Sequence, residues 1–337
     1  MNLDEKIEIV KDILKDKKVA IGFSGGADST LIAYLSSKVS KDTLAITINN
    51  HLMPTDFIKH TQEVTDLFKI KHEIIDINFY NDNDFLNNAP DRCYTCRNLM
   101  YSQIEAKAHE EGFDFICDGN NISDLVSDRP GILITYAKEF ETPLIKSKLT
   151  SKEIHEYLNK NNIPYSRSTT CLATRIPTNT KITEEKIEKI SYLEDYISNN
   201  TTCEIVKVRY FGNVNICEVD DVNELIKDDK FKQINDELKK KGFDELSLNQ
   251  TPIDDNEEII ISYNEGSFRY QLPFTINIEY TKQFILDMKN QNETEIILEN
   301  ICIKESGLIE GNNFKSYENA LNAFMEILPK IRRNVQH

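Results

Sequence analysis

The chain of 337 residues contains no apolar run as long as the roughly 18–20 residues that a membrane-spanning helix requires. Residues 1–6 also lack the positive charge followed by an apolar stretch that marks a secretory signal peptide. We therefore expect a cytoplasmic protein that has no membrane partner.

Basic residues are in deficit. The 40 lysines and arginines face 56 aspartates and glutamates, which gives a formal net charge of −16. Because nucleic-acid binding depends on basic side chains that neutralise phosphates, this balance argues against a DNA or RNA partner, and a small molecule is the expected ligand. The 39% hydrophobic content of a chain this long is enough for the cores of two or three domains.

The seven cysteines do not fit a disulfide framework, because their number is odd and no export signal precedes them. Reduced thiols or a metal centre are the alternatives. Four cysteines stand in strand-like runs and are expected to be structural: Cys117, Cys203, Cys217 and Cys302.

Cys93 and Cys96 form a C-x-x-C motif at an expected loop-to-helix junction, where helix N–H groups, Arg92 and Arg97 would favour thiolates. No second C-x-x-C and no closely spaced histidine pair completes a four-ligand zinc site, so zinc is disfavoured. A redox pair, two cluster ligands and two ordinary cysteines remain open at this point.

Strand-like and helical patterns alternate in the first half of the chain. This alternation predicts an α/β fold, a doubly wound parallel sheet that binds ligands at the carboxyl ends of its strands. The expected strands lie at residues 19–21, 43–48, 72–77 and 113–117, and the expected helices at 3–15, 55–68, 97–110 and 151–161.

We expect this first domain to cover residues 1–168 and a small α+β domain to cover residues 169–248. The second domain would contain a helix at 181–198 and paired strands at 203–210 and 214–219. After a linker at 249–258, residues 259–337 are expected to form an additional α+β unit with a hairpin at 259–271 and a helix at 317–333. The sequence does not give the role of this unit.

A phosphate-binding loop is expected between the first strand and the following helix. In the run S-G-G-A-D-S, Gly25 and Gly26 allow a sharp turn and close approach to an anion, while Ser24 and Ser29 supply hydroxyls. Asp28 would lie in the first helical turn, where it can approach a phosphate-bound Mg²⁺. The loop lacks the lysine of a Walker motif and the G-x-G-x-x-G spacing of a dinucleotide fold.

The pattern S-G-G-x-D-S resembles the signature of PP-loop ATP pyrophosphatases, which implies cleavage of ATP between its α and β phosphates. Three further segments extend the resemblance: residues 118–124 (DGNNISD), residues 129–131 (RPG) and residues 171–177 (CLATRIP). From residue 24 to about residue 218 the chain resembles the LarE family, ATP-dependent sulfur transferases that build the nickel-pincer nucleotide cofactor.

This resemblance implies that ATP adenylates a carboxylate of pyridinium-3,5-biscarboxylic acid mononucleotide and that a sulfur nucleophile then displaces AMP. Family members with a single cysteine at the position of Cys171 sacrifice its sulfur. Because Cys93 and Cys96 accompany Cys171 here, the chain resembles the three-cysteine members, which hold a [4Fe–4S] cluster with one iron free of protein ligands. An external sulfide donor and a homo-oligomer are further expectations.

The resemblance also assigns roles to individual residues. The expected catalytic residues are Cys171, Asp28, Arg175 and Arg209, with Lys207 as a further positive position near the substrate. The expected ATP and Mg²⁺ contacts are Ser24, Gly25, Gly26, Asp28, Ser29, Thr47, Asn49, Gly119, Asp124 and Arg129, and the expected cluster ligands are Cys93, Cys96 and Cys171. Tyr94 is a candidate for stacking on the pyridinium ring.

Two other functions remain open. A tRNA 2-thiolation enzyme also joins an S-G-G-x-D-S loop to cluster cysteines, although the acidic charge argues against a tRNA partner. A nucleotide-binding regulator that senses ATP without turnover is the second alternative.

Overall fold

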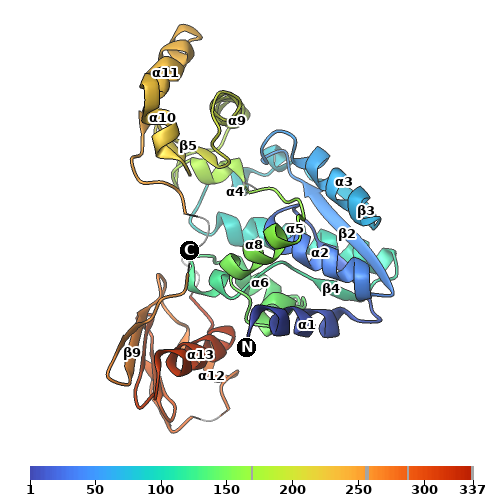
Figure 1. Cartoon of the computed structure of the whole chain (residues 1–337), viewed down its shortest axis with the longest axis vertical. Helices are drawn as coiled ribbons and strands as arrows, with labels where there is room; N and C mark the ends of the chain where they lie inside the picture. The colour runs from blue at the N-terminus through green and yellow to red at the C-terminus, as the bar shows by residue number, and fades with distance from the viewer. Residues whose placement is uncertain (168–169, 255–257, 287, 335–337) are drawn as a thin grey trace.

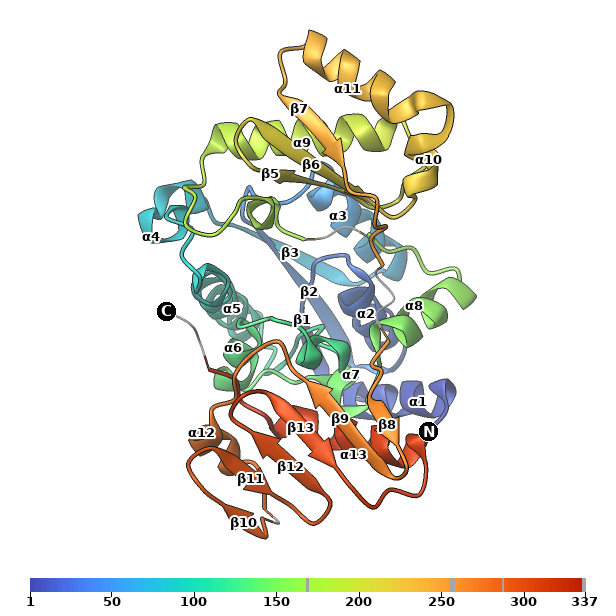
Figure 2. The ribbon, with the colours of Figure 1, turned by 90° about the vertical axis from the view of Figure 1, so that its left-hand side faces the viewer.

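The structure, a computed structural model, describes residues 1–167, 170–254, 258–286 and 288–334. Three units follow one another along the chain: an N-terminal domain, a middle domain and a C-terminal domain. The N-terminal domain lies between the other two, with the middle domain at one end of the long axis and the C-terminal domain at the opposite end (Figures 1 and 2). No helix in the described part of the chain is both long and apolar enough to cross a membrane.

The N-terminal domain is built on a four-stranded parallel sheet with strand order β3-β2-β1-β4. The strands are β1 (Lys18–Gly22), β2 (Asp42–Asn49), β3 (Lys71–Asp76) and β4 (Phe115–Cys117). From β1 the chain adds β2 and β3 on one side of the sheet and then adds β4 on the other side. Open α/β sheets bind ligands at such a switch point, here between β1 and β4. The predicted α/β fold with a parallel sheet is confirmed.

Helices cover both faces of this sheet. Val19, Ile21 and Ala45 pack toward α1 (Leu3–Leu14), α2 (Ala27–Val39) and α8 (Ser151–Lys160), whereas Ala20 and Leu44 pack toward α5 (Arg92–Glu110). Successive residues of a strand point to opposite faces, so two separate cores form on one sheet. The remaining helical segments of this domain are α3 (Phe57–Phe68), η1 (Phe79–Asn81), α4 (Asn83–Leu86), η2 (Ser123–Val126), α6 (Ile132–Ala137) and α7 (Pro143–Lys146).

The middle domain has a three-stranded sheet with strand order β5-β6-β7. β5 (Val206–Tyr210) and β6 (Val214–Val219) form the predicted hairpin, and β7 (Glu245–Leu248) pairs in parallel with β6. The sheet packs on a helical layer through a buried apolar cluster. That layer contains α9 (Glu184–Asn199), α10 (Val222–Ile226) and α11 (Lys230–Lys240), linked by η4 (Lys227–Asp229), while η3 (Leu172–Arg175) precedes α9.

The C-terminal domain is a six-stranded antiparallel sheet with strand order β10-β11-β12-β13-β9-β8. Its core is continuous with side chains of the N-terminal domain, including Ile122, Leu125 and Ile132, so the two domains share one apolar cluster. Its elements are β8 (Ser262–Asn264), β9 (Ser267–Gln271), α12 (Ile278–Lys282), β10 (Asn290–Gln291), β11 (Glu295–Ile297), β12 (Ile301–Lys304), β13 (Leu308–Gly311), α13 (Tyr317–Ile327) and η5 (Leu328–Lys330).

Two predicted helix boundaries are wrong. The helix expected from residue 97 begins at Arg92, so the C-x-x-C motif, expected at a loop-to-helix junction, lies within the first turns of α5. The helix expected to reach residue 333 ends at Ile327, because Pro329 cannot donate the backbone hydrogen bond that an α-helix requires. The domain boundary predicted at Ser168, with the neighbouring Thr169, lies outside the described residues.

Candidate functional site

The loop of residues 23–26 joins β1 to α2 and leaves the helix N-terminus open. Gly25 has a positive φ of 70°, and a Cβ atom there would lie 2.9 Å from the ring of His60, so only glycine fits. Gly26 is the N-cap residue of α2, and it has no side chain that could cap the helix. The first N–H groups of α2 therefore keep their capacity to bind an anion.

Two predicted hydroxyls face each other across this loop. The Oγ atoms of Ser24 and Ser29 lie 3.3 Å apart, and Ser24 donates its backbone N–H to the Ser29 hydroxyl over 3.2 Å. The Ser29 hydroxyl also lies within hydrogen-bond distance of the Gly26 carbonyl, at 3.3 Å. The loop is therefore held in its turn by its own side chains.

Asp28 meets residues from the segment after β4. The Asn121 amide donates to Asp28 Oδ1 over 3.1 Å, and the Asn121 backbone N–H donates to Asp124 over 2.9 Å. Arg129 forms an ion pair with Asp124 at 2.5 Å. Burial and the adjacent Asp124 carboxylate raise the pKa of Asp28 to about 7, and Arg129 only partly offsets them. Two carboxylates near one helix N-terminus form a place where a phosphate-bound Mg²⁺ would be favourable.

Gly119 brings this segment against α2. A Cβ atom at Gly119 would lie 3.0 Å from the backbone nitrogen of Ser29 and 3.2 Å from Asp28 Cβ. The absence of a side chain therefore sets the distance between the segment after β4 and the start of α2. The structure thus brings the predicted residues Gly119, Asp124 and Arg129 together with the loop of residues 24–29.

Sequence reasoning did not assign a role to Asp118 or Asn121. Asp118 is buried at the end of β4 and accepts hydrogen bonds from Thr135 at 2.5 Å, Tyr101 at 3.1 Å and Arg97 at 3.2 Å. The D-G-x-N pattern at residues 118–121 could have pointed to both residues, because carboxylate and amide side chains directly after a buried strand need partners.

Arg97 lowers the pKa of Cys96 in the predicted direction, but its hydrogen bonds belong to this network. Its guanidinium donates to Asp118 and Asn120 rather than to a thiol, and its Cδ atom lies where a side chain at Gly131 would otherwise be. Arg92 is the arginine that reaches a cysteine, since its Nη2 donates to Cys93 Sγ over 3.3 Å. Arg92 Nη1 also donates to the Ala173 carbonyl over 3.0 Å.

The three predicted cluster ligands lie on two segments of the chain. Cys93 and Cys96 lie in the first turns of α5, and Cys171 immediately precedes η3. Cys96 and Cys171 pack against the same apolar cluster, which includes Leu172 and Ile176. Burial raises the pKa of Cys96, and Cys171 and Cys93 raise it further, so the three thiols are close enough to interact electrostatically.

Burial also raises the pKa of Cys171, while Arg92 lowers it by a smaller amount. Arg92 and Arg97 lower the pKa of Cys96 in the expected direction, but burial outweighs them, so the thiolate expected at Cys96 is not favoured. Within residues 1–167, 170–254, 258–286 and 288–334, no group of three or more histidine, cysteine or acidic side chains is arranged to hold a metal ion. The donor set fits an iron–sulfur cluster in chemistry, and the side chains would have to turn toward a common centre to bind one.

Positive side chains of the middle domain lie beside the Cys171 segment. Arg175 is 2% exposed and its Nε donates to Glu194 over 2.7 Å, so it ties this segment to α9. Arg209 donates to the Thr174 carbonyl over 2.9 Å and pairs with Glu218. Burial, followed by Arg175 and Arg209, lowers the pKa of Lys207. Arg175 and Arg209 thus both make contacts within the protein, to Glu194 and to Glu218 respectively.

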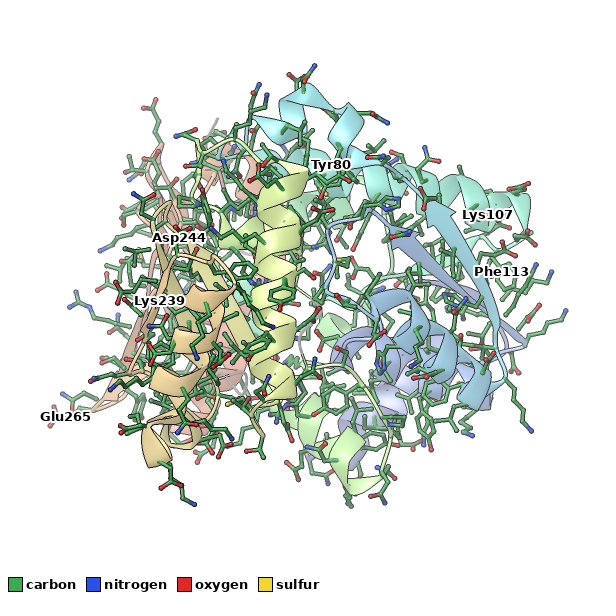
Figure 3. All side chains as sticks on the ribbon, turned by 90° about the horizontal axis from the view of Figure 1, so that it is seen from above. Tyr80, Lys107, Phe113, Lys239, Asp244 and Glu265 are labelled. Atoms are coloured by element: carbon green, nitrogen blue, oxygen red, sulfur yellow. The ribbon has the colours of Figure 1, made fainter. Side chains whose placement is uncertain are left out.

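A cleft of about 390 Å³ opens between the N-terminal domain and α9. Its wall includes Asn49, Tyr80 and Leu172, and the lining also contains Pro54 and Glu188. Figure 3 shows Tyr80 beside one end of α9, on the side that faces the N-terminal domain. Burial raises the pKa of Tyr80 to about 12, with smaller contributions from Glu184, Glu188 and Cys171. Leu172, which lines the cleft, directly follows Cys171 in the chain.

β2 carries Thr47 and Asn49, two residues that were expected to contact the nucleotide. Thr47 is buried, and its hydroxyl donates to the Phe23 carbonyl over 2.9 Å and contacts His72 Nε2 at 2.8 Å. Asn49 lines the cleft and donates to Asp76 over 2.9 Å. A nucleotide contact fits the position of Asn49, which lines the cleft, better than that of Thr47, which is fully buried.

The fold and the open loop can now be compared with known proteins. Residues 4–92 match the NAD synthase family. The N-terminal domain is a PP-loop domain. This fold implies that the chain binds ATP and Mg²⁺ and is an ATP-utilising enzyme, which agrees with the loop of residues 24–29 and with Asp28 and Asp124 beside it.

Relatives of known sequence extend the match beyond the PP-loop domain. The chain is 29% identical to the uncharacterized protein MJ0830 of Methanocaldococcus jannaschii, over 71% of this chain and 92% of that protein. It is 22% identical to the pyridinium-3,5-bisthiocarboxylic acid mononucleotide synthase of Lactiplantibacillus plantarum, over 70% of this chain and 87% of that protein. The second relative confirms the resemblance to the LarE family.

A shorter stretch is similar to a different kind of thiolating enzyme. Over 62 residues the chain is 42% identical to the tRNA-specific 2-thiouridylase MnmA 2 of Fusobacterium nucleatum, which is 18% of each protein. Because this match is limited to less than a fifth of either chain, it supports a shared PP-loop domain and not a shared overall architecture.

Proposed function

We propose that this protein uses ATP to transfer sulfur to a carboxylate of pyridinium-3,5-biscarboxylic acid mononucleotide. The observation that carries the proposal is that Cys96 and Cys171 pack against one apolar cluster beside the cleft that Leu172 lines, with Cys93 one helical turn before Cys96 in α5. The similarity to the mononucleotide synthase, 22% identity over 70% of this chain, also supports the proposal.

The first step is adenylation. A carboxylate oxygen of the substrate attacks the α-phosphorus of ATP, and the bond to the β-phosphate oxygen breaks to release pyrophosphate. The open N–H groups at the start of α2 and the hydroxyls of Ser24 and Ser29 would hold the departing phosphates. Asp28 and Asp124 would contact the Mg²⁺ that neutralises them.

The second step is sulfur transfer. A free carboxylate resists nucleophilic attack, whereas the acyl adenylate presents AMP as a leaving group. A sulfur nucleophile adds to the carbonyl carbon, and AMP departs with the original carboxylate oxygen. Arg209 and Lys207 would bind the anionic groups of the mononucleotide beside the Cys171 segment, and Tyr80 supplies an aromatic wall for its cationic ring.

The source of the sulfur is proposed to be a [4Fe–4S] cluster held by Cys93, Cys96 and Cys171. Three thiolates leave one iron without a protein ligand, and a cluster bound in this way would supply a sulfide at that iron. The alternative is sacrifice of the Cys171 sulfur, in which the side chain becomes dehydroalanine.

Iron and mass analysis separate these two sources. After anaerobic reconstitution, the Cys93→Ala variant should lose the iron and the brown colour of the wild-type protein, while Cys302→Ala, which alters a half-buried cysteine of the C-terminal domain, should keep both. Unchanged iron in Cys93→Ala would reject the cluster. A Cys171 residue that becomes lighter by the elements of H₂S after turnover would instead establish sacrifice.

A tRNA-thiolating activity is the second candidate, favoured by the short match to the 2-thiouridylase. Filter binding with bulk tRNA tests it, and the net charge of −16 predicts no retention at moderate salt. A regulator that binds ATP without turnover is tested by pyrophosphate release. Release that requires both ATP and the pyridinium mononucleotide would exclude the regulator.

A further inference from the structure

A bridging segment, residues 122–136, connects the nucleotide loop to the C-terminal domain. We propose that the C-terminal domain shapes the ATP site through this segment and that Arg333 is a positioning residue for Asp124 and Arg129. The proposal requires only that ATP binds at the loop of residues 24–29, so it does not depend on the identity of the sulfur acceptor.

One side of the bridging segment faces the nucleotide loop. Asp124 lies close enough to Asp28 to raise its pKa, and Arg129 pairs with Asp124 at 2.5 Å. Backbone hydrogen bonds from Arg129 to Ser127 at 2.9 Å and from Ile132 to Arg129 at 3.1 Å fix the turn that carries Arg129. A displacement of this turn would therefore move the ion pair beside Asp28.

The neighbouring residue on the same turn is held by the C-terminal domain. Asp128 forms an ion pair with Arg333 at 2.6 Å, and Arg333 is only 8% exposed. The Arg333 guanidinium also lies over the ring of Phe274, 4.5 Å from its centroid. Since Asp128 and Arg129 are consecutive, a residue of the C-terminal domain is coupled to the nucleotide loop through one peptide unit.

A second contact fixes the far end of the bridging segment. Arg332 lies 3.8 Å from the ring centroid of Tyr136 in α6 and 3.8 Å from that of Phe284 in the C-terminal domain. Arg332 is 4% exposed and donates to the Pro329 carbonyl over 2.8 Å. Two consecutive arginines of the C-terminal domain therefore hold the bridging segment, Arg333 at Asp128 and Arg332 at Tyr136.

The apolar side of the bridging segment belongs to the C-terminal core. Ile122, Leu125 and Ile132 are buried in the cluster that contains Phe324 and Leu328. Figure 2 shows the C-terminal domain lying against the N-terminal domain near α6 and α7. The bridging segment, which carries Asp124 and Arg129, therefore packs against the C-terminal domain as well as against the N-terminal domain.

The chain offers a matched control. Lys148 and Glu326 form another ion pair between the same two domains, at 2.8 Å, and neither residue belongs to the bridging segment. If the C-terminal domain only needed to dock, the loss of either ion pair would affect the protein similarly. If it positions the nucleotide site, only the loss of Arg333 should weaken ATP binding.

The test measures Mg–ATP affinity of the full chain by calorimetry, together with the melting temperature. We expect Arg333→Met to weaken Mg–ATP binding about tenfold, Arg333→Lys to restore most of that loss, and Lys148→Met to leave affinity within about twofold of wild type. Where Arg333→Met fails to fold, Asp128→Asn weakens the same ion pair from its exposed partner, whose side chain is 64% exposed.

Three outcomes would overturn the proposal. The first is unchanged affinity in both Arg333→Met and Asp128→Asn. The second is an equal loss in Arg333→Met and Lys148→Met, which would show a general docking effect. The third is full additivity of Arg333→Met and Asp128→Asn in a double-mutant cycle, because residues that act through one ion pair cannot lose it twice.

Discussion

The side-chain amide of Asn121 donates a hydrogen bond to Asp28, with 3.1 Å between Nδ2 and Oδ1. This contact joins the segment after β4 to the first turn of α2, two regions that are distant in the sequence. It orients a carboxylate whose burial is otherwise unfavourable, and it places that carboxylate at the helix N-terminus where phosphates would bind.

Asp28→Asn should abolish ATP-dependent pyrophosphate release and flatten the pH dependence of stability. The pKa of Asp28 is raised from 3.8 to about 7, so the folded chain retains a proton that the unfolded chain releases. This contribution to stability is complete below pH 3.8 and is lost as the pH rises through about 7. Urea denaturation of the wild-type protein and of Asp28→Asn at about pH 5 and about pH 8 measures this contribution. An equal fall in the free energy of unfolding between the two pH values in both proteins would contradict the raised pKa.

Gly119→Ala should weaken Mg–ATP binding by roughly tenfold, because the new Cβ atom would lie 3.0 Å from the Ser29 nitrogen and push the segment after β4 away from α2. Gly22→Ala is the control, since its Cβ atom would meet Ile104 at an ordinary 3.4 Å. Equal affinities of the two variants, measured by calorimetry, would show that this close approach has no bearing on the nucleotide.

Arg175→Met should destabilise the protein by about 3–5 kcal/mol, because it leaves Glu194 buried without its cation. Arg175 is 2% exposed, and the Arg175–Glu194 pair measures 2.7 Å. Arg269→Met breaks an arginine–glutamate pair on the exposed face of the C-terminal domain and should have little effect on urea denaturation. Equal midpoints for both variants would argue against a structural role for Arg175.

In the metal-free protein, iodoacetamide should label Cys93 before Cys96 and leave Cys117 until the protein unfolds. Cys93 is exposed, whereas burial raises the pKa values of Cys96 and Cys117. Peptide mass mapping over time gives the order. Labelling of Cys96 as fast as Cys93 would mean that α5 opens at its first turns.

The sequence allowed prediction of the local features of the site. The strands of the N-terminal domain and the glycine-rich turn follow from residue patterns over short windows. The start of α5 at Arg92 was missed because cysteine, tyrosine and threonine are weak helix formers, although Pro90 and Asp91 directly before it are typical of a helix start.

Long-range pairing could not be predicted in the same way. The partner of Arg175 is Glu194 on α9, and the partner of Arg97 is Asp118 after β4, because the packing of whole elements decides which charges meet. The shared core of Ile122 and Leu125 with the C-terminal domain likewise depends on how two domains dock. No local pattern encodes these contacts.

The most direct test of the proposed function is the mass of the pyridinium mononucleotide after anaerobic incubation with the reconstituted protein and Mg–ATP. The account predicts a product in which sulfur replaces one carboxylate oxygen, formed together with one AMP and one pyrophosphate. Formation of AMP and pyrophosphate with an unaltered mononucleotide, or no pyrophosphate at all, would contradict it.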